Sequence, residues 1–139
     1  MAIPSPTIPS ASNAVTAVRL NPTENNRAFY IYSGLIAADN TETTVISVND
    51  IGKRDILFCM NPMLTVESGD NMSMKVKSNG SVVYQTLYDQ GGDNGISWPM
   101  TVHLILPANS SLEVTFTNSD ASSHEVGIAA YGYYMEKFQ

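Results

Sequence analysis

Apolar and polar residues alternate along most of the chain, and this pattern predicts β-strands. It is clearest in 101–106 (TVHLIL) and 112–118 (LEVTFTN), on either side of a turn at 107–110 (PANS). Successive side chains of a strand point to opposite faces, so each run has one apolar face to bury. In the first run this face comprises Val102, Leu104 and Leu106. We expect the two runs to pair as a hairpin, and the rest of the chain to be organised around it.

A second hairpin is predicted from 72–78 and 81–88, because Asn79-Gly80 is the preferred pair for a two-residue type I′ turn. With the register set by that turn, the expected apolar face comprises Met72, Met74, Val76, Val83 and Leu87. Gln85 falls on the same face. Either it finds a polar partner there, or a bulge shifts the register.

Four more strands are expected, at 27–37, 41–48, 55–60 and 124–135, with Asn61-Pro62 ending the third. Gly34 is expected to mark a bulge or a close approach. In the last strand, Tyr131 and Tyr133 lie on the face opposite Val126. About eight short strands with turns between them, and no helical period, predict an all-β sandwich or barrel.

The first 25 residues have a different composition, with prolines at 4, 6 and 9 among Ser, Thr and Ile. Proline removes backbone donors and fixes φ, so we expect an extended N-terminal arm over 1–25 and a β-domain over 26–139. A disordered tail and an arm that docks on a neighbouring subunit are both open. The apolar residues that would dock are Ile3, Ile8, Val15 and Val18.

Charge and cysteine content narrow the class of protein. The 139 residues suit one domain, only 14% of them are charged, and the net charge is −6. We therefore expect no nucleic acid as a direct ligand, since that binding needs a basic surface. No apolar run is long enough for a membrane span, and the N-terminus does not resemble a secretory signal. Cys59 is the only cysteine; we expect a buried thiol, compatible with a reducing cytoplasm.

No catalytic or metal-binding motif stands out. His103 and His124 are the only histidines, and neither has a ligand at zinc spacing. Asp89, Asp93 and Asn94 would suit calcium by their oxygen ligands, but a flexible exposed loop is the simpler interpretation. The sequence holds no nucleophile elbow and no phosphate-binding loop. We expect no enzyme, no cofactor and no metal.

The aromatic residues allow two interpretations, core packing or a contact surface. Tyr131, Tyr133 and Tyr134 are the candidates for an interface between subunits. A second candidate surface, for a carbohydrate, comprises Trp98, Tyr88, Asp89 and Asp93.

Several segments together resemble the small β-sandwich, jelly-roll-like capsid decoration, cement and head-fibre proteins of tailed phages and related viruses. These segments are FYIYSGLIA with TTVISV, GKRDILFCMN, SNGSVVYQTLY, and the final stretch HLILPANSSLEVTFTNSDASSHEVGIAAYGYY. The resemblance implies a single antiparallel β-sandwich with an N-terminal arm. It also implies a non-enzymatic virion protein on the capsid surface, assembled in the host cytoplasm. The partners would be copies of itself, as a trimer, and the major capsid protein. The alternative is a carbohydrate-binding or adhesin module.

Overall fold

The computed structural model describes residues 15–19, 28–64, 71–89, 101–119 and 123–135. Within these ranges the chain forms strands and no helix. The strands are β1 (Val15–Arg19), β2 (Ala28–Tyr32), β3 (Ile36–Ala38), β4 (Thr43–Asp50), β5 (Ile56–Leu64), β6 (Asn71–Ser78), β7 (Ser81–Asp89), β8 (Val102–Leu106), β9 (Leu112–Asn118) and β10 (His124–Tyr134).

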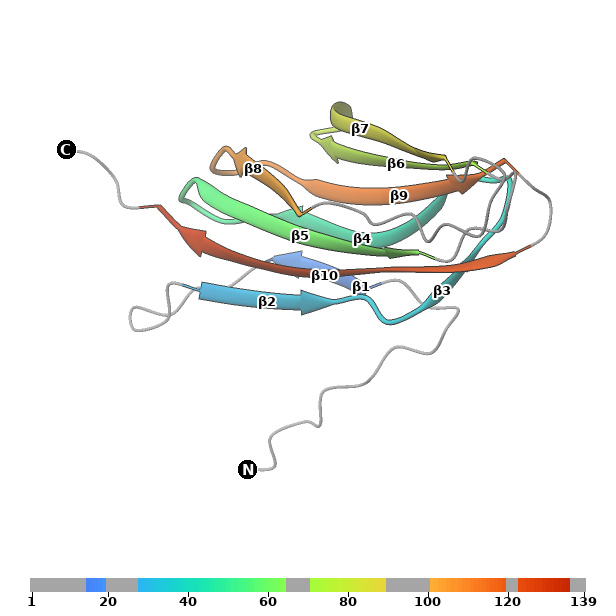
Figure 1. The fold of residues 1–139 in the computed structure, drawn as a ribbon. Helices are drawn as coiled ribbons and strands as arrows, with labels where there is room; N and C mark the ends of the chain where they lie inside the picture. The colour runs from blue at the N-terminus through green and yellow to red at the C-terminus, as the bar shows by residue number, and fades with distance from the viewer. Residues whose placement is uncertain (1–14, 20–27, 65–70, 90–100, 120–122, 136–139) are drawn as a thin grey trace.

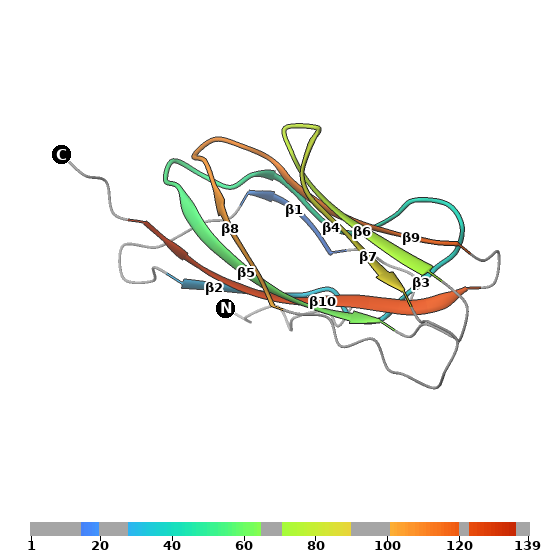
Figure 2. The same ribbon diagram turned by 45° about the horizontal axis from the view of Figure 1, so that its top comes forward.

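The strands form two sheets that pack as the layers of a sandwich (Figures 1 and 2). One sheet has the order β1-β4-β9-β6-β7, and the other has the order β2-β10-β5-β8, with β3 also paired to β10. The predicted all-β sandwich is confirmed. Its pairs are antiparallel except β1 with β4, which is parallel. Strand β1 lies within 1–25, the segment expected to form an arm, and the division of the chain at residue 25 stays a prediction.

The core lies between the sheets and is built from the alternating positions. Phe58 of β5 and Phe116 of β9 are fully buried. The ring of Phe29 stacks on Phe58 at 6.3 Å and meets the edge of Tyr134 at 5.9 Å. Met72 and Met74 of β6 complete this layer. Buried aromatic and aliphatic side chains of this kind supply most of the free energy of folding.

The prediction that 101–106 pairs with 112–118 as a hairpin is wrong. Strand β8 pairs with β5, whereas β9 lies in the other sheet between β4 and β6. The inward and outward faces of β8 were predicted correctly, since Val102 and Leu106 are buried and Ile105 is exposed. The segment 107–111 therefore crosses from one sheet to the other. The pairing was predicted wrongly because two strands that face each other across a sandwich show the same alternation as the two strands of a hairpin.

This crossing is tied to a second one, between β4 and β5. The amide of Asn109 donates to the carbonyl of Gly52 at 2.7 Å, and the amide of Ile51 donates to the carbonyl of Ser110 at 2.9 Å. The carboxylate of Asp55 accepts from the amide of Ala108 at 2.8 Å. The two connections between the layers thus form one hydrogen-bonded corner.

The hairpin of β6 and β7 is confirmed, and its register contains the bulge that Gln85 suggested. Lys77 pairs with Val82, but Val76 pairs with Tyr84, so one extra residue lies in β7. The bulge reverses the faces of β7: Tyr84 and Tyr88 turn toward the core. The expected burial of Val83 and Leu87 is wrong, because their side chains are exposed.

Burial of Tyr88 gives a measurable pH dependence. Desolvation, together with the nearby Tyr84, raises the pKa of Tyr88 to about 12. An unfolded tyrosine ionises near pH 10, so the folded state resists an ionisation that the unfolded state accepts. The stability that this phenol contributes should therefore be lost between about pH 10 and pH 12. Melting temperatures across this window should fall more steeply for the wild type than for Tyr88→Phe; parallel curves would contradict the assignment.

The expected strand at 27–37 is divided in two. Between β2 and β3 the side chain of Ser33 takes part in the ladder, because its hydroxyl accepts from the amide of Ile128 at 2.8 Å. The amide of Ser33 donates to the carbonyl of Ile128 at 2.9 Å. Gly34 follows with a φ of 73°, a conformation that favours glycine. The irregularity expected at Gly34 is thus present.

The expected end of a strand at Asn61-Pro62 is wrong, because β5 continues through both residues. Pro62 pairs with Ile128, whose backbone amide and carbonyl are directed to Ser33 on the other side. Pro62 therefore occupies a position of the ladder where no donor is needed. On its other side, the pairing with β8 ends at Met60. A proline is tolerated in a strand at such a position.

Candidate functional site

The outer face of the sheet β2-β10-β5-β8 carries a cluster of exposed tyrosines. Tyr30 and Tyr32 project from β2, and Tyr131 and Tyr133 from β10, with side chains 68%, 41%, 38% and 51% exposed. Leu57 of β5 and Ile105 of β8 extend the cluster across the sheet. We call these six residues the tyrosine face.

Strand register places five of these six side chains in two rows, while Tyr32 lies one row further along, opposite Ala129. One row across the four strands comprises Tyr30, Tyr131, Cys59 and His103, and the next comprises Ala28, Tyr133, Leu57 and Ile105. The rings of Tyr131 and Tyr133 meet edge to face at 6.2 Å. Alternation along β2 and β10 places all four tyrosines on one side of the sheet, opposite the core.

Cys59 lies beneath this surface, only 4% exposed, as expected for its thiol. It is directly opposite Tyr131 in the ladder. The charge interaction and hydrogen bond with Cys59 raise the pKa of Tyr131. Like an ordinary tyrosine, Tyr131 presents a neutral phenol at physiological pH.

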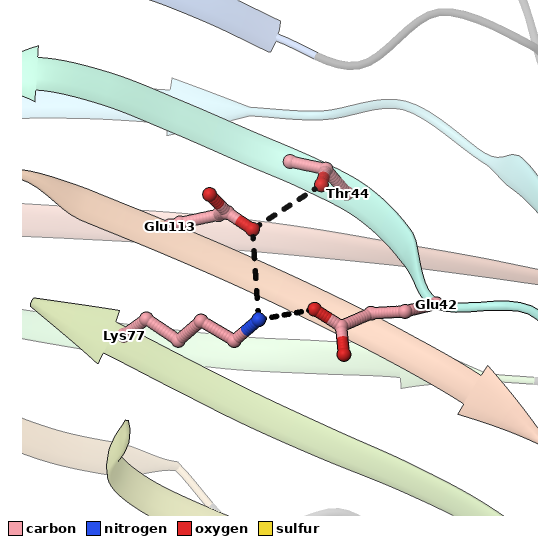
Figure 3. Close-up of polar contacts among 4 residues, drawn as sticks. All are labelled: Glu42, Thr44, Lys77 and Glu113. Atoms are coloured by element: carbon pink, nitrogen blue, oxygen red, sulfur yellow. Dashed lines mark hydrogen bonds and ion pairs between the residues drawn. The ribbon is translucent and has the colours of Figure 1, made fainter. Parts of the chain in front are cut away.

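On β4, β6 and β9 the outer face of the other sheet has an opposite character, formed by Ser, Thr, Lys and Glu side chains. Figure 3 shows Lys77 of β6 between the carboxylates of Glu42 and Glu113. Its Nζ lies 4.0 Å from Glu113 and contacts Glu42 directly, while Thr44 donates to Glu113 at 3.5 Å. The ammonium group of Lys77 lowers the pKa of Glu42, and Glu42 in turn raises the pKa of Lys77. This face is organised for contact with water.

The difference between the faces singles out the tyrosine face as the candidate site. Its two rows contain no carboxylate and no lysine or arginine. Interface cores are enriched in tyrosine and depleted in charged residues. Tyrosine also brings a large apolar area with a polar tip, at low cost in conformational entropy. The arrangement suits contact with another macromolecular surface.

The predicted interface residues fall in different places. Tyr131 and Tyr133 lie on the tyrosine face, but Tyr134 is only 5% exposed and packs against Phe29. Tyr134 follows Tyr133, whose side chain points outward, so alternation along β10 directs the side chain of Tyr134 toward the core. Val15 and Val18 belong to β1, whereas Ile3 and Ile8 lie outside the described residues.

Sequence reasoning missed Tyr30 and Tyr32 as members of this surface. The signal was present in AFYIY, where the two tyrosines alternate with Phe29 and Ile31. Their position beside Tyr131 follows only from the pairing of β2 with β10.

The residues of the predicted carbohydrate surface are not brought together within the described residues. Tyr88 is 9% exposed and belongs to the core. Asp89 is the last residue of β7. Trp98 and Asp93 lie outside the described residues.

The described residues contain no group of three or more His, Cys, Asp or Glu side chains placed to hold a metal ion. Nor does this part of the chain form a helix long and apolar enough to cross a membrane.

Comparison with known proteins gives a likeness of fold. No family model matches the sequence, and no curated protein matches it. Among solved structures, the fold is similar to a chain of the VP2 subviral particle of infectious bursal disease virus, with a TM-score of 0.51 and 14% sequence identity. The match covers 78% of this chain and 33% of the VP2 chain, so this protein spans about a third of that chain's length. The β-sandwich described above is therefore an architecture that also occurs in a protein of a viral particle.

Proposed function

We propose that this protein is a non-enzymatic structural component of a virion, which decorates or cements a phage capsid. The observation that carries the proposal is the tyrosine face, an uncharged aromatic surface on one side of a sandwich whose other side is polar over β4, β6 and β9. The fold shared with a subviral-particle protein supports it. In this role the protein resides on the capsid surface, after assembly in the host cytoplasm.

The tyrosine face is large enough to matter for assembly. Its four rings expose on the order of 400 Å², taking about 200 Å² for a whole tyrosine side chain. A stable protein interface buries about 800 Å² on each partner. The rings thus supply about half of such a contact before Leu57, Ile105 and the rim are included. We propose that the face contacts a neighbouring copy in a trimer and the major capsid protein.

Removing two rings tests this role. Tyr30→Ser with Tyr133→Ser removes the two most exposed rings, and neither ring belongs to the core cluster. We expect the wild type to assemble in units of three and these units to dissociate at least about a hundredfold more readily in the double variant, because loss of two aromatic contacts costs several kcal/mol. Sedimentation velocity over a concentration series measures both.

The matched control is Lys75→Ser with Thr117→Ser, on the polar outer face of the other sheet. It should leave the sedimentation of the protein unchanged. Equal assembly of the tyrosine double variant and the wild type would contradict the proposal, as would a wild type that stays monomeric and does not co-sediment with capsids.

The alternative, a carbohydrate-binding or adhesin module, has weaker support because Tyr88 is buried in the core. Exposed tyrosines also stack on sugars, so the tyrosine face would be the surface to test. A glycan array distinguishes the two functions: binding that disappears in the tyrosine double variant would favour the module.

A further inference from the structure

Strand β7 ends one sheet with an open edge. Among the described residues it pairs with β6 on one side and has no partner strand on the other. Alternate backbone amides and carbonyls of this nine-residue strand therefore point outward along the edge. Such an edge is a template for pairing with another strand.

Apart from the bulge at Val83, the edge lacks the features that usually prevent such pairing. Residues 81–88 contain no charged side chain and no proline. Val82, Val83 and Leu87 are 48%, 50% and 61% exposed. By contrast, the edge strand β8 is only five residues long and is followed by Pro107. Proteins protect long edges with lysine, proline, bulges or short strands. Strand β7 has the bulge at Val83, but no lysine and no proline along 81–88, and its pairing with β6 is regular from Tyr84 to Asp89.

We propose that β7 pairs in antiparallel orientation with β7 of a second copy, about a two-fold axis that passes at Gln85. The two five-stranded sheets then continue into one of ten strands. A two-fold contact of this kind is isologous, so each copy contributes the same residues. Strand addition at a sheet edge is an established mode of recognition, with main-chain hydrogen bonds supplying affinity.

The side chains of β7 select this register. With Gln85 opposite itself, Val83 of one copy lies opposite Leu87 of the other, and the same pair occurs again across the axis. Both side chains are exposed in the single chain, so each apolar residue gains an apolar neighbour. A shift by two residues would place Val83 opposite Gln85 instead. The central register is therefore the one that buries most apolar surface.

Charge favours the same surface. Each copy carries a net charge of −6, so two copies repel each other on average. The run 81–88 is uncharged, and so it is a place where two copies approach with little local repulsion. The contact does not depend on the proposed virion role, and it involves a different surface from the tyrosine face.

Disulfide trapping tests the pairing on the full chain. In Gln85→Cys the two introduced thiols lie opposite each other across the axis, where adjacent strands are about 5 Å apart, within reach of a disulfide. The matched control is Ser73→Cys on β6, opposite Leu87, where the thiols of two copies lie at least about three strand spacings apart. Buried Cys59 is present in both, so any cross-link through it appears in the control.

We expect non-reducing electrophoresis after mild oxidation to show a dimer for Gln85→Cys and at least tenfold less for Ser73→Cys. Adding Leu87→Lys should reduce the cross-linked dimer about tenfold, since the substitution acts twice across the axis. Gln85→Cys combined with Tyr30→Ser and Tyr133→Ser should cross-link as Gln85→Cys alone does, which separates this contact from the proposed function. Equal cross-linking of the two cysteine variants, or none in Gln85→Cys, would overturn the proposal.

Discussion

Phe58→Ala is expected to destabilise the protein by about 3–5 kcal/mol, among the largest effects of any single substitution here. Phe58 is fully buried in β5, between the two sheets, and its ring stacks on Phe29. Truncation removes the transfer free energy of the ring and leaves a cavity that two hydrogen-bonded sheets cannot close. The aromatic contact with Phe29 is lost as well.

Chemical denaturation measures this loss directly. A domain usually has 5–15 kcal/mol of stability in total, so the variant should unfold at a much lower denaturant concentration. Phe58→Leu, which keeps most of the volume, should cost clearly less. Tyr133→Ala, at an exposed position, should change the free energy of unfolding by about 1 kcal/mol or less. A small loss for Phe58→Ala, similar to that for Tyr133→Ala, would contradict the described core.

Gly132→Ala is expected to cost about 3 kcal/mol, although only one methyl group is added. A Cβ at this position would lie 2.5 Å from Cε1 of Phe29 and 2.6 Å from the carbonyl oxygen of Leu57. The backbone of Leu57 is held by β10 on one side and β8 on the other, so it cannot move freely. Overpacking of this kind usually costs 1–3 kcal/mol, and a backbone clash places it at the upper end.

Two further variants identify the cause. Gly80→Ala adds a methyl group where no atom lies within 4 Å, so only its φ of 80° opposes the change, at a cost of about 1–2 kcal/mol. Phe29→Leu in the Gly132→Ala background should restore part of the stability, because it removes the contact with the ring but not the contact with Leu57. Thermal melts of the wild type, Gly132→Ala, Phe29→Leu and the double variant measure the coupling. Independent, additive effects would show that Phe29 does not cover Gly132.

Alternation along the sequence predicted most of the strands, and their buried faces except in β7. It placed Val102 and Leu106 inward and Tyr131 and Tyr133 outward, as the structure does. It did not predict which strands pair, because β8 and β9 bury their inner faces in the same way whether they share a sheet or face each other across the core. The hydrogen-bonded corner that joins the two layers depends on residues from distant segments, and no local pattern reports it.

The candidate site was predictable only in part for the same reason. Each of β2 and β10 carries two outward tyrosines, and each pair alone is an ordinary surface feature. The tyrosine face exists because these strands, far apart in sequence, pair side by side. The bulge in β7 is different, since Gln85 on an expected apolar face was a local sign of it, and the structure places the extra residue two positions earlier.

The position of β10 has a consequence for how the protein folds during synthesis. Among the described residues, β2 and β3 pair only with β10, which also forms the longest ladder with β5. Strands β2 and β3 therefore remain unpaired while the ribosome adds about a hundred further residues. Such long-range closure is slow and leaves strands exposed to aggregation. Folding of this sheet is therefore completed only after His124–Tyr134 has left the ribosomal tunnel, and chaperone binding to the earlier strands would be most useful in that interval.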